Sequence, residues 1–228
     1  MTLGTFRPAF LPGLTYFWQI AQCDVAVFTD HLSFSKGSSI NRSAPFPDGQ
    51  TVLRIPVLHN EKRGRIFETE IDYHSGWKEK HLKTLHHFFH NLPFAYYYLP
   101  ELEDLFNSEF NSLGDFLFEL HKILVHWLHL SVRFLRSSEG DFNGSAEELI
   151  AFWCAKTHSA TYISQPETFE NQWVNKQQLK EKGLEISTFS PLPDSHLLRN
   201  YQDTTILQFL LQFGPEAGFI IQQYLPSK

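Results

Sequence analysis

Short apolar runs with the length of buried strands alternate along this chain with longer segments that have helical periodicity. The apolar runs predict strands at 25–28, 52–58, 132–135, 161–163 and 184–189, and a less regular one at 66–73. The segments around them predict helices at 14–22, 77–90, 99–105, 113–128, 146–157, 169–182, 204–213 and 215–224. This alternation is typical of an α/β fold, and it predicts a mixed or mostly parallel sheet flanked by helices.

The length and continuity of the chain favour one domain. Its 228 residues suit one large domain or two small ones, and the sequence shows neither an internal repeat nor a low-complexity linker. We therefore expect a single domain over residues 1–228, with the helical stretch from 77 to 130 forming a sub-lobe. Aromatic residues make up 15% of the chain and include 22 Phe, so ring packing should dominate the core.

Charge and hydropathy argue against several classes of protein. The formal net charge is −6 and the chain has no long basic stretch, which disfavours nucleic-acid binding. No run of about 18 apolar residues is present, so no membrane span is expected, and the N-terminus lacks the features of a signal peptide. Cys23 and Cys154 form no CxxC motif and should be buried small hydrophobes. We therefore expect a cytoplasmic protein.

Polar residues that follow the apolar run at 25–28 form the first candidate site. Asp30 comes just after this run, where a carboxylate can accept a substrate hydroxyl or serve as a base. Lys36 and Arg42 can hold a phosphate or carboxylate, and the Asn41 amide can both donate and accept. An ordered loop, in which Asp30 caps backbone amides and the two cations are solvated, explains the same residues.

A histidine on an apolar helix face is the second candidate. Trp77, His81, Leu85 and Phe88 share one face of the helix expected at 77–90, because their spacings are four, four and three. In a cleft, His81 would be a natural general acid or base near neutral pH. A core histidine with a satisfied hydrogen bond explains the same pattern.

Other motifs of catalysis are weak or missing. His86 and His90 share a helix face, as do His126 and His129, and such pairs can contribute to a Zn²⁺ site. However, HExxH is absent and no paired cysteines add ligands, so solvated or interface histidines are the better interpretation. Because GxSxG, GxGxxG and GxxxxGK[ST] are also absent, an α/β-hydrolase, a classical dinucleotide enzyme or a kinase is disfavoured. The sequence does not identify a cofactor, and whether the protein uses one is left open.

The order and spacing of several short motifs resemble those of the WbqC-like protein family, which is found beside bacterial surface-polysaccharide genes. No single motif is specific, but their combination extends over nearly the whole chain. The matching residues are Pro12, Tyr16-Phe17, Asp24, Asp30, Ser35-Lys36, Asn41-Arg42, Pro56-Val57, Trp77 with Lys80-His81, Pro93-Phe94, Tyr162-Ile163-Ser164, the segment 205–210 and Gly214-Pro215-Glu216.

Two positions depart from the family pattern. Many members have His-Gln before the first proline, where this chain has Phe6-Arg7, and many have Asp in the late helix, where this chain has Gln208. If either position is catalytic in the family, activity here is lost or uses Arg7. Arg7 is therefore included among the expected substrate-binding residues.

The resemblance implies a cytoplasmic enzyme that modifies a sugar precursor of surface polysaccharide. Acyl or aminoacyl transfer to a nucleotide-linked amino sugar is the reaction class that fits this setting. His81 would act as the base, with Asp30 orienting it or the substrate. Lys36 and Arg42 would hold the phosphate or carboxylate of the donor, and Asn41 would position the acceptor. The expected partner is thus a small molecule, such as a nucleotide-linked sugar or an acyl donor.

Aromatic residues and two other functions complete the expectations. Tyr16, Trp77 and Tyr97 can supply an aromatic floor for a sugar ring. The chief alternative is a non-catalytic carbohydrate- or nucleotide-binding module that serves a glycosyltransferase. A third alternative is a metal hydrolase with histidine ligands. Convergence of His81, Asp30 and Arg42 in one pocket would favour chemistry over simple binding.

Overall fold

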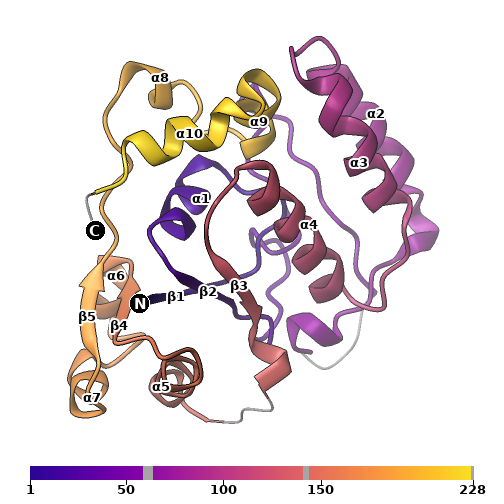
Figure 1. Cartoon of the computed structure of the whole chain (residues 1–228). Coiled ribbons are helices and arrows are strands. Elements are labelled where there is room, and N and C mark those ends of the chain that lie inside the picture. The colour runs from indigo at the N-terminus through magenta and orange to yellow at the C-terminus, as the bar shows by residue number, and fades with distance from the viewer. Residues whose placement is uncertain (59–63, 141–143, 227–228) are drawn as a thin grey trace.

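The computed structural model describes residues 1–58, 64–140 and 144–226, and within them the strands form one parallel sheet (Figure 1). The sheet order is β3-β2-β1-β4-β5. This result confirms the predicted α/β fold and shows that the sheet is entirely parallel. The strands are β1 (Thr2–Phe6), β2 (Val25–Phe28), β3 (Arg133–Arg136), β4 (Thr161–Ser164) and β5 (Glu185–Thr188).

The order in which the chain adds strands to the sheet changes side once, although all strands stay parallel. From β1 the chain steps outward to β2 and then β3, and it next crosses back to place β4 on the other side of β1. The connections that leave β1 and β4 therefore run toward opposite edges of the sheet. In open parallel sheets, ligands bind outside the carboxyl ends of the strands at such a switch point. The topology thus marks the gap between the ends of β1 and β4 as the place to look for a site.

Helices cover both faces of the sheet, and α2 and α3 pack side by side on one flank (Figure 1). This pair accounts for the first part of the helical stretch 77–130, which was expected to form a sub-lobe. The helices are α1 (Leu14–Ala21), α2 (Trp77–Phe89), α3 (Ala95–Asn107), α4 (Leu113–Trp127), α5 (Ala146–Thr157), α6 (Pro166–Glu170), α7 (Lys176–Glu181), α8 (His196–Arg199), α9 (Ile206–Phe213) and α10 (Glu216–Gln223).

Two hydrophobic clusters lie against the two faces of the sheet. Along β2, Val25 and Val27 join the smaller cluster with residues of α5 and α7, while Ala26 and Phe28 join the larger cluster with α1, α4 and α9. Successive side chains of a strand point to opposite faces, so a strand covered on both sides is apolar throughout. Both cysteines are buried as expected, and burial raises the pKa of the Cys154 thiol to about 11.

Four elements differ from the sequence expectations. The segments 52–58 and 66–73 are not strands, because they form only isolated bridges such as Val57 with Ile71 and a short 3-10 turn, η1 (Ile66–Glu68). The helix expected at 169–182 is two short helices, α6 and α7, separated by a segment in which Gln172 has a positive φ of 55°. Finally, β1 was not expected at all, although it is the central strand.

A glycine in β1 permits the close packing of this central strand. Gly4 lies between Ala26 of β2 and Ile163 of β4. A Cβ at this position would lie 2.7 Å from the Cys23 Sγ and 2.9 Å from the Phe6 Cε2, and both side chains are buried. The strand therefore requires a residue without a side chain here.

We predict that Gly4→Ala lowers the free energy of unfolding by about 1–3 kcal/mol, because overpacking a core costs energy of this order. Urea unfolding monitored by tryptophan fluorescence measures the change. Gly64→Ala is the matched control, since a Cβ at Gly64 meets nothing within 4 Å. Equal stability of the two variants would contradict the close packing of β1.

Candidate functional site

A cavity of about 660 Å³ opens at the switch point of the sheet. Thr5 and Arg7 line it from the end of β1, and Ser164 and Gln165 line it from the end of β4. Helix α1 and the first turn of α5 supply further walls. The volume lies within the range of roughly 300–1,000 Å³ that is usual for small-molecule sites. The sheet topology and the cavity therefore indicate the same position.

One wall of the cavity is a connected series of hydroxyl groups. The Thr5 Oγ1 lies 2.8 Å from the Tyr162 hydroxyl, Tyr162 also hydrogen-bonds Ser164, and the Ser164 hydroxyl donates to the Thr168 Oγ1 at 2.9 Å. All four residues line the cavity. Burial raises the pKa of Tyr162, so its hydroxyl stays protonated. Because hydroxyls both donate and accept, this wall suits a ligand that carries hydroxyls of its own.

Arg7 supplies the positive charge of the cavity. Among the described residues that line it, Arg7 is the only Lys, Arg, Asp or Glu. Its Nη2 donates to the Ser33 carbonyl at 3.1 Å, which uses one of the five guanidinium N–H groups. The Tyr16 hydroxyl donates to the Arg7 carbonyl at 3.0 Å and holds the backbone at this point. The electrostatics of the cavity therefore favour an anionic ligand.

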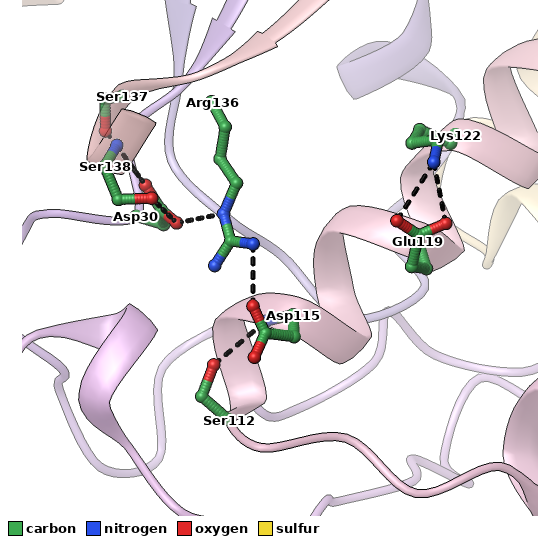
Figure 2. Close-up of polar contacts among 8 residues, drawn as sticks. All are labelled: Asp30, Ser112, Asp115, Glu119, Lys122, Arg136, Ser137 and Ser138. Carbon is green, nitrogen blue, oxygen red and sulfur yellow. Dashed lines mark hydrogen bonds and ion pairs between the residues drawn. The ribbon is translucent and has the colours of Figure 1, made fainter. Parts of the chain in front are cut away.

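A buried carboxylate joins the ends of β2 and β3 beside the cavity (Figure 2). Asp30 is completely buried and accepts from the Arg136 Nε at 2.6 Å, the Ser137 hydroxyl at 3.0 Å, and the backbone N–H and hydroxyl of Ser138 at 3.0 and 2.8 Å. The Arg136 Nη1 also pairs with Asp115 of α4 at 2.6 Å. These contacts hold the carboxyl ends of two strands and the start of α4 in one arrangement.

His31 connects this buried network to the cavity. It follows Asp30 directly, lines the cavity, and places its Nδ1 2.7 Å from the Ser137 hydroxyl oxygen. Burial lowers the pKa of His31, the negative charge of Asp30 raises it, and the positive charge of Arg65 lowers it again. The sum of these effects is a lowered pKa, which favours the neutral imidazole near pH 7.

His81, the predicted base, lies in the aromatic core rather than in the cavity. Its ring is 5.0 Å from the Trp77 ring and 6.0 Å from the Phe10 ring, measured between centroids. Burial lowers the pKa of His81 to about 4, and a hydrogen bond with the Arg54 carbonyl opposes this only in part. Trp77 is buried in the same cluster. Neither side chain lines the cavity.

The predicted loop residues are dispersed. Asn41 is buried, and its Nδ2 donates to the Ile55 carbonyl at 2.8 Å, next to the carbonyl that His81 contacts. Lys36 and Arg42 are exposed and do not line the cavity. Of the eight predicted site residues, Arg7 and Tyr16 line the cavity, and Asp30 contacts it through Ser137 and His31. The structure thus does not bring His81, Asp30 and Arg42 into one pocket.

Sequence reasoning missed several residues of the cavity. His31 could have been identified because it follows Asp30 at the end of a buried strand. Ser164 likewise ends an apolar run. Tyr162 was recognised only as part of a family motif and not as a site residue, and Ser137 gave no signal, since a serine after a strand is common. Their proximity to Thr5 and Asp30 depends on the sheet order.

A match to a family model decides the membership of the chain. Residues 7–204 match the model of the WbqC-like protein family. The chain belongs to this family. No curated protein and no solved structure gives a significant match. The WbqC-like region begins at Arg7, which is also a cavity residue.

The described residues of this WbqC-like chain contain no helix that is long and apolar enough to span a membrane, and no group of three or more His, Cys, Asp or Glu side chains arranged to hold a metal. Two of the histidines considered as Zn²⁺ ligands, His86 and His90, have other partners. The His86 Nε2 lies 2.6 Å from a Glu103 carboxylate oxygen, and the His90 Nδ1 contacts the His86 carbonyl.

We predict that Arg136→Met lowers the free energy of unfolding by about 3–5 kcal/mol, because it leaves the Asp30 carboxylate buried without its cation. Arg199→Met removes an exposed ion pair with Asp194 and should cost less than about 1 kcal/mol. Urea titration of both variants measures the two values. A similar, small cost for both would mean that the buried pair does not hold the strands together.

We predict that His81 makes the folded state less stable in acid. Because its pKa in the folded chain is about 4, below the usual 6.5, the unfolded chain binds the proton first as the pH falls. Stability should therefore decrease from pH 6.5 to pH 4, by up to about 3 kcal/mol for this residue. His81→Phe should flatten this slope, whereas His87→Gln, at an exposed position, should not. If His81→Phe kept the wild-type slope of stability against pH, His81 would not be buried in the core.

Proposed function

We propose that the switch-point cavity binds a nucleotide-linked sugar and that the protein is a cytoplasmic group-transfer enzyme of bacterial surface-polysaccharide biosynthesis. The observation that carries the proposal is the positive charge of Arg7 placed in the same cavity as the hydroxyl series from Thr5 to Thr168. An arginine can bind a phosphate through two parallel hydrogen bonds. Hydroxyl groups can then exchange hydrogen bonds with the hydroxyls of a sugar.

Aromatic side chains support the assignment to sugars. Trp173 lines the cavity and is 66% exposed, although a large apolar side chain is normally covered. Tyr16 and Phe189 also line the cavity. Flat apolar rings with polar groups beside them provide the surface on which a sugar ring or a nucleobase can pack. The combination of ring surface, hydroxyls and one cation fits a sugar that carries phosphate.

Acyl or aminoacyl transfer is the reaction that we propose for this site. The acceptor amine or hydroxyl of the sugar attacks the carbonyl carbon of a thioester or ester donor, so a C–N or C–O bond forms. The C–S or C–O bond to the leaving group of the donor breaks, and one proton moves from the acceptor to that leaving group. His81 lies too deep in the aromatic core to be our candidate for this proton transfer.

A non-catalytic module that binds a carbohydrate or nucleotide is the second candidate. The observation that favours it is that Phe6 and Arg7, where we expect the chain to depart from the family pattern, both line the cavity. Such a module would bind the same ligand through Arg7 and the hydroxyl series from Thr5 to Thr168. It would not turn over an acyl donor.

We predict that a nucleotide-linked amino sugar raises the melting temperature of the wild-type protein, and that Arg7→Ala weakens its binding roughly 10- to 100-fold. The loss corresponds to hydrogen bonds with a charged group, which contribute about 1.5–3 kcal/mol. Thermal shift and isothermal titration calorimetry measure the effect. Arg42→Ala is the matched control, since Arg42 is an exposed cation outside the cavity and its removal should leave binding unchanged.

Two outcomes would decide against the proposal. If Arg42→Ala lost binding and Arg7→Ala kept it, the ligand would bind at the loop predicted from sequence. If the sugar bound but no acyl-CoA or aminoacyl donor was consumed, the non-catalytic module would be the correct function.

A further inference from the structure

The orientation of the His31 ring is fixed by a series of hydrogen bonds that ends on a buried charge. The His31 Nδ1 lies 2.7 Å from the Ser137 Oγ, and this hydroxyl donates to the Asp30 Oδ1 at 3.0 Å. Asp30 is completely buried and Ser137 is nearly so. Histidine, serine and aspartate are thus connected in order from the cavity wall to the interior.

The protons in this series can be assigned from the chemistry of the groups. An ionised carboxylate only accepts hydrogen bonds, and a hydroxyl has one proton to donate. Ser137 therefore donates its proton to Asp30, since otherwise two oxygen lone pairs would face each other at 3.0 Å. The Ser137 oxygen then accepts, so the partner atom, the His31 Nδ1, carries a hydrogen. In the neutral ring the lone pair is consequently on the Nε2.

The surroundings of His31 suit a proton acceptor. His31 lines the cavity, and its Nε2 has no hydrogen-bond partner among the described residues. The charged groups that affect it are Asp30 and Arg65, and Arg7 lines the same cavity. Burial and Arg65 favour the neutral ring, while Asp30 stabilises the protonated ring once it forms. A base that is neutral at rest and stabilised after protonation matches what group transfer requires.

We propose that the His31 Nε2 accepts the proton released by the acceptor group of the substrate, and that Ser137 and Asp30 are positioning residues for this ring. The proton leaves the attacking N–H or O–H, forms the imidazolium of His31, and then passes to the leaving group of the donor, so the ring is regenerated. The inference rests on the proposed function of the cavity. It adds the group that performs the proton transfer.

The tautomer of His31 provides the first test, and it requires no substrate. In protein with ¹⁵N-labelled histidine at pH 7.5, NMR should show a protonated Nδ1 and an unprotonated Nε2 for His31. Ser137→Ala should shift the ring toward the other tautomer. Ser138→Ala is the matched control, because the Ser138 hydroxyl donates to the same carboxylate, whereas the hydrogen bonds of His31 go to Ser137. A protonated Nε2 in the wild type, or no change in Ser137→Ala, would overturn the proposal.

Chemical modification provides a second test, on the wild-type protein alone. Diethyl pyrocarbonate acylates unprotonated imidazole nitrogens, and peptide mass spectrometry locates the product. We expect His31 to react at least tenfold faster than the core residues His81 and His121, and UDP-glucosamine to slow the reaction. An unreactive His31 would overturn the present inference. A reactive His31 that UDP-glucosamine does not protect would instead overturn the substrate class in the proposed function.

Discussion

The buried carboxylate of Asp30 is the interaction on which the candidate site depends. A charge without contact to water requires partners, and within the described part of the chain every donor comes from the segment Arg136–Ser138. These donors reach Asp30 only when β2 and β3 lie side by side in the observed register, with Phe28 opposite Arg136. The requirement to satisfy one buried charge thus fixes the carboxyl edge of the sheet and places His31 on the cavity wall.

The cavity owes its position to topology and its chemistry to the residues at the strand ends. The connections after β1 and β4 diverge at the switch point, so neither covers the gap between the two strands. Polar groups without net charge, such as those of Thr5 and Ser164, line this gap, and Arg7 adds a positive charge. Among the residues that the structure describes, a ligand that enters therefore meets one fixed charge and many hydrogen-bonding groups, which is the basis of the proposed specificity for a phosphorylated sugar.

Much of the fold was predictable because its signals are local. The helix at 146–157 was predicted with its observed bounds, since Ser145 and Glu148 form the expected capping box. The strand β2 was equally clear, because a strand covered on both faces is apolar throughout. By contrast, β1 contains Gly4 beside Thr5 and lacks a long apolar run, so its central place was hidden. The apolar residues at 53 and 55 are buried without joining the sheet, and their pattern therefore led to a wrong prediction of a strand at 52–58.

The sequence by itself determined the family, the α/β class and the apolar face that carries His81, because these depend on composition and on spacings along the chain. Only the tertiary structure decided that this face packs into an aromatic core rather than a cleft. Asp30 was likewise recognisable in the sequence as a polar residue after a strand. Its partner Arg136, however, lies in a strand 106 positions later in the chain. Pairing between distant segments follows from sheet order, and no local pattern encodes it.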